Sequence, residues 1–237
     1  MERLEAEKRL KDLLTFVGQQ GASDLHLVMG RYPTLRINGR RPTKGAIDFG
    51  SNVPLYVSSS SAREEQLMDD AQSSTALSVG AEGYSLSDVF TASVIAIDEH
   101  EMKDVPIQVP KQWNYETECI IGMPILKRFR FLFNFPNNVF WCLPVASNFD
   151  EAFAKDRSGL GVVASKQGLC VVHVAARSPA ELAGIRIGDE IIQINGKDVD
   201  VKFLQSGKRI GTSPSGTSIE IAFSNGSRKT IVLRDYF

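Results

Sequence analysis

The apolar residues of this chain come in short runs that turn-forming residues interrupt. Between residues 158 and 237 the runs are GVVAS, LCVVHVA, EIIQI, SIEIAF and KTIVLR. Tight-turn pairs flank them, such as Gly188-Asp189 and Asn195-Gly196, and an Asn-Gly pair between apolar runs is a strong signal for a β-hairpin. Runs this short and this rich in Val and Ile favour strands over helices. The pattern therefore predicts a mostly β chain.

The first half of the chain repeats this pattern, with two exceptions. Short strands are predicted in DLHLVM and TLRIN, and in VFTASVIAI and VPIQV, which the charged turn DEHEMKD separates. The polar stretch from Ser58 to Gly83 has no sustained periodicity and predicts a long surface loop that contains at most one helical turn. At the start of the chain, apolar residues fall on one side of a helix that glycines end. These residues are Leu4, Leu10, Leu13, Leu14 and Val17, followed by Gly18 and Gly21.

The change of character along the chain predicts two domains. Residues 146–157 are polar and lack the alternation of a strand, which is typical of a linker. With 237 residues, of which 43% are hydrophobic, the chain can bury a proper core on each side of this linker. The expected segments are a helix over 1–22, a first domain over 23–145, the linker over 146–157 and a second domain over 158–237.

The charges of the chain are balanced, which argues against two classes of partner. Lys and Arg number 27 against 28 for Asp and Glu, so the formal net charge is −1. No overall field attracts nucleic acid or an anionic membrane surface. No apolar run is long enough for a signal-peptide core or a membrane span. We therefore expect a cytoplasmic protein with neither partner, or a bacterial periplasmic one if a leader has been removed.

The residues that bind metals or form disulfides are scattered along the chain. The three cysteines lack CxxC spacing and lie in apolar surroundings, which favours buried thiols in a reducing compartment. The three histidines have no ligand spacing. We therefore predict no metal site and no cofactor. The residues concerned are Cys119, Cys142, Cys170, His26, His100 and His173.

The predicted second domain carries an ordered series of turn and cap residues. Ser158 to Val163 read SGLGVV, and VVHVAARSPAELAGIRIGDEIIQINGKDV follows from Val171. Ser178 is placed to cap a short helix, and Gly184 is placed to end it in the left-handed conformation. Together these motifs resemble the PDZ domain, most closely its bacterial forms, over residues 158–237.

The PDZ resemblance implies a site for a peptide C-terminus or an extended strand. In that family, backbone amides of the SGLG-type loop face the terminal carboxylate, and the peptide adds as a strand beside the strand that follows. A helix lines the other wall, which corresponds to residues 203–210 here. An equally open alternative is that the apolar residues of this region are plain core. The expected peptide-binding residues are Gly159, Leu160, Gly161, Val162, Phe203 and Leu204.

Three stretches between about residues 33 and 144 carry a second series of motifs. They read PTLRINGRRPTKGAIDFGSN, VIAIDEHEMKDVPIQV and IIGMPILKRFRFLFNFPNN, and together they resemble a retropepsin-like aspartic protease domain. The resemblance implies that Asp48 is a catalytic acid, with Gly50 and Ser51 in support and the Ser51 hydroxyl placed to orient the carboxylate. Such sites use two carboxylates about 3 Å apart that share a proton. Since this chain has one such loop, the resemblance implies a homodimer, with a flap supplied by residues 80–91.

One residue of this loop departs from the family pattern. The family has Thr or Ser after the aspartate, and that hydroxyl links the two loops across the dimer axis, whereas this chain has Phe49. A phenyl ring donates no hydrogen bond. Two functions follow as alternatives: an active aspartic endopeptidase whose PDZ domain selects peptides, and a catalytically silent relative that acts as a peptide-binding scaffold. Without the resemblance, Asp48 would be interpreted as a turn residue.

Residues 12–40 resemble a different family. The stretch DLLTFVGQQGASDLHLVMGRYPTLRINGR is similar to the start of type IV pilus retraction ATPases. Those motors need a Walker A loop, whose lysine reaches the phosphates of the nucleotide. The nearest stretch, GTSPSGTS at residues 211–218, lacks that lysine, so nucleotide hydrolysis is not expected.

Overall fold

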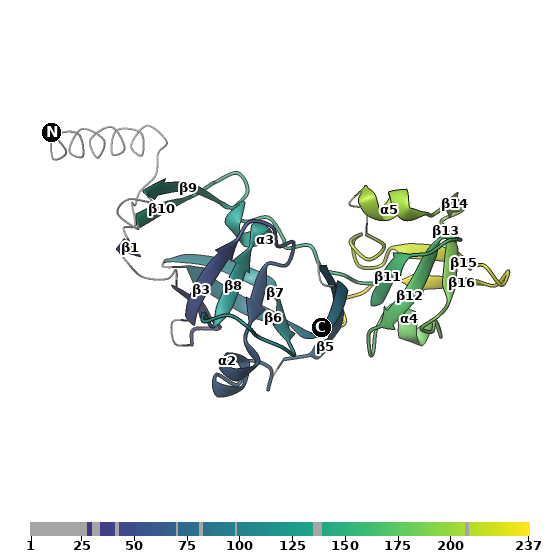
Figure 1. Cartoon of the computed structure of the whole chain (residues 1–237), viewed down its shortest axis with the longest axis horizontal. Coiled ribbons are helices and arrows are strands. Elements are labelled where there is room, and N and C mark those ends of the chain that lie inside the picture. Colours follow the sequence, from purple (N-terminus) through teal and green to yellow (C-terminus); the bar gives the residue numbers. More distant parts are fainter. Residues whose placement is uncertain are drawn as a thin grey trace.

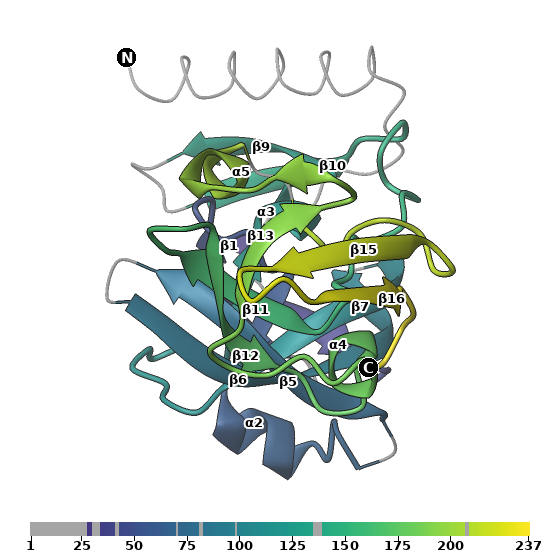
Figure 2. The same ribbon diagram turned by 90° about the vertical axis from the view of Figure 1, so that its right-hand side faces the viewer.

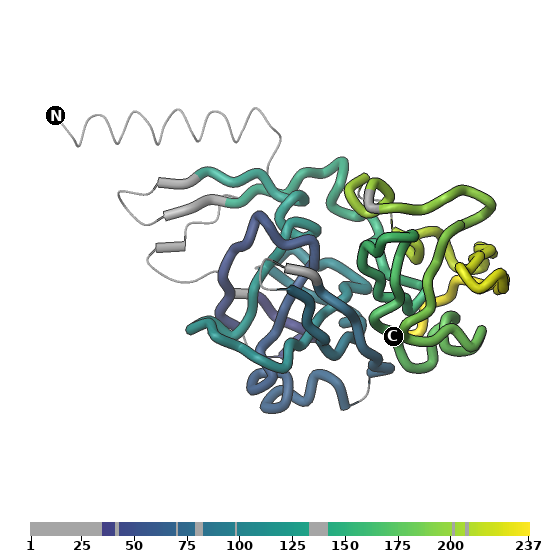
Figure 3. The backbone as a smooth tube through the Cα atoms, turned by 45° about the vertical axis from the view of Figure 1, so that its right-hand side comes forward, coloured from purple at the N-terminus to yellow at the C-terminus, as the bar shows by residue number. Residues whose placement is uncertain are grey.

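The chain folds into two lobes that lie side by side (Figures 1 and 3). Within the described residues it is mostly β, as the sequence predicts, with sixteen strands and four short helices. The helix predicted over residues 1–22 lies outside the described residues. The computed structural model describes residues 28–29, 34–40, 43–69, 71–80, 83–97, 99–134, 139–206 and 209–237.

Seven strands of the first lobe form a sheet that closes on itself. The strand order is β2-β3-β8-β4-β7-β6-β5, and β2 also pairs with β6. Its inward side chains form the first hydrophobic core, in which Leu55, Ile95, Ile107 and Ile121 are buried. The bounds are β2 Thr34–Ile37, β3 Thr43–Asp48, β4 Leu55–Val57, β5 Ser73–Gly80, β6 Gly83–Ile97, β7 His100–Pro110 and β8 Cys119–Gly122.

The long hairpin of β6 and β7 corrects the prediction that DEHEMKD is a turn. Strand β7 already begins at His100, and the ladder with β6 continues from there. Met102 and Val105 are buried, whereas Glu101 and Lys103 are exposed. The two buried residues are three apart, and Asp104 between them is exposed with a φ of +52°, so pairing with β6 rather than strict alternation carries the strand through the charged residues. The connection between the strands is shorter than the sequence pattern predicts.

The polar stretch predicted as a surface loop contains two regular elements. Helix α2, Ser59–Glu64, begins after Ser58, whose hydroxyl accepts a hydrogen bond from the Ser61 amide at 3.1 Å. Strand β5 then pairs with β6 along its whole length. The many hydroxyl side chains of β5 conceal the strand in the sequence, because pairing and burial rather than intrinsic preference decide such a segment.

A small second sheet and one helix complete the first lobe. Strands β9, Phe129–Asn134, and β10, Val139–Pro144, form a hairpin, and β1, Val28–Met29, pairs with β10. Helix α3, Met123–Leu126, follows directly on β8 and packs two buried side chains into the first core.

The second lobe is a six-stranded antiparallel sheet with two short helices and its own hydrophobic core. The strand order is β11-β12-β13-β15-β16, and β14 pairs with β13. The predicted cap is confirmed, since the Ser178 hydroxyl accepts from the Glu181 amide at 3.3 Å and Gly184 has a φ of +68°. The bounds are β11 Leu160–Ala164, β12 Leu169–Val174, α4 Pro179–Leu182, β13 Glu190–Ile194, β14 Lys197–Asp198, α5 Val201–Gln205, β15 Ser218–Phe223 and β16 Arg228–Val232.

Residues 146–157 contain no strand or helix, yet they are anchored to the first lobe. Phe153 lies in the first core. The guanidinium of Arg128, which is 2% exposed, stacks 3.7 Å from the centre of the Phe153 ring. It also donates hydrogen bonds to the carbonyl oxygens of Phe149 and Glu151. Burial lowers the pKa of Arg128, and the nearby acidic residues oppose this effect. A buried cation thus holds the connecting segment in place.

Strand β5 is also the place where the two lobes meet. Figure 2 shows β11 and β12 in front of β5 and β6. The Thr75 hydroxyl lies 3.1 Å from Nε2 of His173 on β12. Near the end of the chain, the Thr91 hydroxyl donates to the Phe237 carbonyl at 3.2 Å. Hydrogen bonds therefore connect the two lobes at β12 and at the C-terminal residue Phe237.

Replacing Arg128 by alanine is expected to lower the free energy of unfolding by about 3 kcal/mol, because buried carbonyl oxygens lose their donors. Arg128→Lys should restore only part of this, since lysine lacks the planar fork of donors. Urea denaturation measures both. Arg186→Ala is the control, because Arg186 is exposed and its loss should change the free energy of unfolding little. An effect of Arg128→Ala no larger than that of Arg186→Ala would contradict the anchoring role.

Candidate functional site

Asp48 stands at the end of β3, at a point fixed by an inserted strand. Strand β8 lies between β3 and β4, although β3 and β4 follow one another in the chain. It runs parallel to β3, with Asp48 opposite Gly122, and antiparallel to β4. The connection from β3 to β4 must therefore cross the end of β8. This crossing segment is the loop that the sequence analysis singled out.

Backbone hydrogen bonds fix the loop to the end of β8. The Met123 amide donates to the Ser51 carbonyl at 2.9 Å, and the Gly122 amide donates to the Pro54 carbonyl at 2.9 Å. The Gly50 amide donates to Asp48 Oδ1 at 2.8 Å. Asp48 itself is exposed. A solvent-facing carboxylate thus sits on a loop whose backbone has little freedom.

Gly122 explains why the loop can lie so close to β8. A Cβ atom at this position would stand 2.0 Å from the Val53 carbonyl oxygen and 3.0 Å from the Ser51 hydroxyl. Contacts of that length with backbone do not occur, so any side chain would push the loop away from β8. The glycine of the IIG motif is therefore required by close approach.

The predicted supporting residues have different partners from those expected. The Ser51 hydroxyl was expected to orient the Asp48 carboxylate, but it pairs with the backbone of Val53, 3.3 Å from the carbonyl oxygen and 3.2 Å from the amide. The Gly50 amide holds the carboxylate instead. Ser51 therefore shapes the loop, and Gly50 contacts the acid.

Phe49 contacts the small sheet of the first lobe. Its ring meets Phe131 of β9 edge-on, with ring centroids 6.0 Å apart and an interplanar angle of 87°. The side chain is still 52% exposed, and Met123 and Leu132 are exposed apolar residues of the adjoining elements. The position that carries a hydroxyl in the family thus carries an aromatic contact here.

The residues for which a flap is predicted, 80–91, fall within the hairpin of β5 and β6, which begins at Ser73. Residues 81–82 lie outside the described part. On β5, the Ser78 hydroxyl donates to Gln108 Oε1 at 2.8 Å and lies 3.3 Å from the Tyr56 hydroxyl. Tyr56 belongs to β4, directly after the Asp48 loop. The hairpin is thereby linked to the strand that leaves the loop.

The predicted peptide groove has its apolar residues at the second core. Strand β11 is the edge strand of its sheet and, among the described residues, pairs with β12 alone. Leu160 and Val162 of β11 and Phe203 and Leu204 of α5 pack partly buried against the second core. These four residues are brought together, which leaves both the pocket and the core interpretation consistent with their positions.

The loop before β11 is organised by a residue that sequence analysis assigned to the linker. Asp156 accepts hydrogen bonds from the Ser158 amide at 3.1 Å, the Gly159 amide at 2.8 Å and the Ser158 hydroxyl at 2.7 Å. The Tyr236 hydroxyl donates at 2.9 Å to Oδ2 of Asp156, the oxygen that also accepts from the Gly159 amide. Burial raises the pKa of Tyr236, and the Asp156 charge adds to this. The signal was an aspartate two residues before Ser-Gly, which favours an Asx turn.

Gly159 and Gly161 are confined for different reasons. Gly159 has a φ of +75°, and a Cβ there would stand 2.1 Å from Cβ of Ser178. Gly161 is not in the left-handed region, yet a Cβ there would stand 2.8 Å from Cβ of His173 and 2.9 Å from Leu77. The first glycine is required by the turn and by packing, and the second by packing alone.

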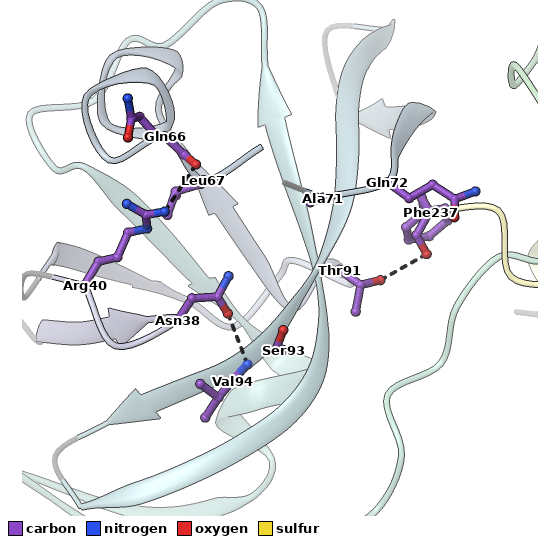
Figure 4. Close-up of a pocket in the computed structure, with 10 residues that line it drawn as sticks. All are labelled: Asn38, Arg40, Gln66, Leu67, Ala71, Gln72, Thr91, Ser93, Val94 and Phe237. Atoms are coloured by element: carbon purple, nitrogen blue, oxygen red, sulfur yellow. Dashed lines mark hydrogen bonds between the residues drawn. The ribbon is translucent and has the colours of Figure 1, made fainter. Parts of the chain in front are cut away.

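A cavity of about 620 Å³ lies at the other end of β3 from Asp48 (Figure 4). Its walls are mostly polar, and Phe237 of the second lobe forms part of them. The distance along β3 separates this cavity from the Asp48 loop. Its lining residues are Asn38, Arg40, Gln66, Leu67, Ala71, Gln72, Thr91, Ser93, Val94 and Phe237.

Neither a metal site nor a membrane-spanning helix is present in the described part of the chain. No three His, Cys, Asp or Glu side chains gather there closely enough to hold a metal ion. No helix among the described residues is long and apolar enough to cross a membrane. Burial raises the pKa of the Cys119 thiol, and the charge of Glu118 adds to this.

Among solved structures, the chain is similar to a retropepsin-like aspartic protease from Rickettsia conorii. The identity is 16% and the TM-score 0.38, over 50% of this chain and 98% of that one. It is also similar to the HtrA-type protease AlgW in complex with a decapeptide, at 13% identity and a TM-score of 0.31, over 69% of this chain and 61% of that one. No curated protein matches the chain. The likeness of residues 12–40 to pilus ATPases finds no support in these comparisons.

One family model matches part of the sequence. Residues 171–221 match the PDZ domain. The match runs from β12 into β15 and includes α4, its Ser178 cap and the turn at Asn195-Gly196. These are the motifs on which the sequence analysis based its prediction. The C-terminal part of the chain therefore contains a PDZ domain.

Proposed function

We propose that the chain is an aspartic endopeptidase of the retropepsin-like type that acts as a homodimer, and that its PDZ domain binds peptide C-termini or strands. The observation that carries this proposal is the Asp48 loop. It presents an exposed carboxylate, it is held by the end of β8, and Gly122 lets it approach that strand closely. The three sequence motifs between residues 33 and 144 add to it.

The chemistry requires a second carboxylate. Two carboxylates about 3 Å apart cannot both ionise, so they share one proton. The ionised one takes a proton from the attacking water, and the protonated one gives its proton to the carbonyl oxygen of the peptide bond. A single loop of this type per chain supplies one acid. A twofold dimer that brings two copies of Asp48 together would complete the pair.

The surrounding residues have separate roles in this proposal. Gly50 positions the carboxylate through its amide, and Ser51 shapes the loop through its contact with Val53. The β5–β6 hairpin would cover the substrate and exclude water. Because the Phe49 ring is engaged with Phe131, it lies against its own subunit's sheet. We take this contact as the reason why the ring need not block the dimer axis.

The PDZ domain would select the substrate by strand addition. The open edge of β11 offers unpaired backbone groups to an extended peptide, as in other strand-adding modules. Leu160 and Val162 on one wall and Phe203 and Leu204 on the other would receive its apolar side chains. Gly159 and Gly161 would shape the loop and β11 from the side that faces Ser178, His173 and Leu77. The ligand class is therefore a peptide with an apolar C-terminal residue.

The predicted division of the chain remains part of this proposal. Two separate hydrophobic cores support a first domain over residues 23–145 and a PDZ domain over 158–237, joined by residues 146–157. The contact of Arg128 with this joining segment suggests that it acts as a fixed connection rather than a free tether.

A second function is favoured by one observation, the absence of a hydroxyl after Asp48. The Phe49 ring cannot form the hydrogen bond by which a hydroxyl at this position would link two loops across a dimer axis. The carboxylates would then be less well preorganised, and preorganisation is a large part of such catalysis. The chain would then be a catalytically silent scaffold that binds peptides through its PDZ groove. The two functions share the groove and differ in the cleavage step.

Replacing Asp48 by asparagine is expected to abolish cleavage of an unfolded protein substrate. Wild-type cleavage should increase as the pH falls, because one carboxylate of the pair must be protonated. Asp69→Asn is the matched control, since it removes the same charge from an exposed position outside the loop. Unchanged cleavage in the Asp48 variant, or no cleavage by the wild-type protein at any pH, would contradict the protease function. The scaffold function would then be favoured.

Replacing Leu204 by aspartate is expected to weaken binding of a fluorescent peptide that ends in valine by at least about tenfold, a difference of about 1.4 kcal/mol. The reason is that a charge would enter the apolar wall of the groove. Fluorescence polarisation measures the affinity. Ile187→Asp, at an exposed apolar position of the same domain, should leave it unchanged. Equal affinities of the two variants would contradict the assigned groove.

A further inference from the structure

The flap strand β5 packs against the back of the peptide-binding strand β11. Leu77 of β5 fills the space that a side chain at Gly161 would occupy, since a Cβ there would stand 2.9 Å from both Cβ and Cδ2 of Leu77. Gly161 does not have a positive φ, so its backbone conformation does not demand glycine. The glycine is explained by how closely β5 and β12 approach. Gly161, a residue of the proposed peptide site, is therefore also a point at which the flap strand β5 packs.

Successive residues of β5 are tied to β12 and to the turn after it. The Ser74 hydroxyl donates to the Ala176 carbonyl at 2.9 Å. The Thr75 hydroxyl lies 3.1 Å from Nε2 of His173, a side chain that is 7% exposed. The Arg177 guanidinium donates to the carbonyl of Ser73. The contact therefore extends from Ser73 to Leu77, most of the described flap strand.

The two faces of β5 have different attachments. Thr75 and Leu77 point toward the PDZ domain, while Ser78 bonds to Tyr56 and Gln108 of the first lobe. In the described part of the chain, β5 pairs with β6 alone, so its other edge carries no strand. The flap strand is thus held between β4, which follows the Asp48 loop, and strands β11 and β12 of the PDZ domain.

A second connection reaches the loop before β11. The Gln72 amide group donates to the Tyr236 carbonyl at 3.1 Å, one residue before β5 begins. The Tyr236 hydroxyl donates to Asp156, which holds the amides of Ser158 and Gly159. Gln72, at the base of the flap strand, and Asp156, which accepts from the Ser158 and Gly159 amides, therefore contact the same tyrosine.

We propose that peptide binding at β11 and docking of the β5–β6 hairpin on the PDZ domain are thermodynamically coupled, so that a bound peptide stabilises the docked hairpin. This rests on the proposed peptide binding but not on proteolysis. A peptide that adds to β11 fixes the strand against which Leu77 packs, so docking then orders fewer groups. Coupling free energies are reciprocal, so loss of the docking contact must weaken peptide binding by the same factor.

Hydrogen exchange of the full chain tests this coupling, with and without a short synthetic peptide that ends in valine and has a free carboxylate. The peptide should slow exchange in β11 and also in residues 73–80. In Leu77→Ala, the effect on residues 73–80 should disappear, and peptide affinity should fall by about fivefold. Leu182→Ala is the matched control, since Leu182 lies on α4, outside the β5–β6 hairpin, and is 69% exposed.

The outcomes separate the coupling from the peptide binding. Slower exchange in β11 with no change in residues 73–80 would overturn the coupling and leave the PDZ groove intact. No change in either region would overturn both.

A variant without peptide tests the docking itself. Gly161→Ala should speed exchange of residues 73–80, because its Cβ meets Leu77, whereas Ala164→Val at the exposed end of β11 should not. Equal exchange of residues 73–80 in the two variants would show that the contact between Leu77 and Gly161 does not hold the hairpin, and this would overturn the coupling.

Discussion

The position of strand β8 is the constraint on which the site depends. Strands β3 and β4 follow one another in the chain but are not neighbours in the sheet. Strand β8, which comes roughly seventy residues later in the chain, lies between them. The loop between them is forced over the end of β8, where the Gly122 and Met123 amides hold it. Asp48 owes its exposure and its fixed backbone to this arrangement. A lone aspartate in a turn would be exposed too, but its backbone would not be held in this way.

The same principle of close approach organises the contact between the lobes. Gly122 admits the Asp48 loop, and Gly161 admits Leu77 of the flap strand. Around the second contact, Thr75 and His173 satisfy polar groups that would be costly to bury alone. The flap strand is therefore a structural part of both lobes. Any movement that closes it over a substrate must either carry the PDZ domain along or break this contact.

The sequence predicted those parts of the structure that local chemistry determines. Asn195-Gly196 and the Ser178 cap act through their immediate neighbours, and both match the predicted PDZ motif. Strand β5 was missed, because its serines give no hydrophobic alternation and its pairing with β6 decides. Asp156 was assigned to a linker, since its partner Tyr236 is distant in the sequence. The hydroxyl of Ser51 was expected at Asp48 but serves the loop backbone instead.

The central claim is that two copies of Asp48 meet to form one catalytic pair. The most direct measurement is the separation of the two Asp48 carboxylates in a crystal structure of the protein at the oligomeric state it has in solution. The account predicts a twofold dimer with carboxylate oxygens about 3 Å apart, close enough to share a proton. Carboxylates several ångströms farther apart, or an Asp48 that faces no second copy, would contradict it.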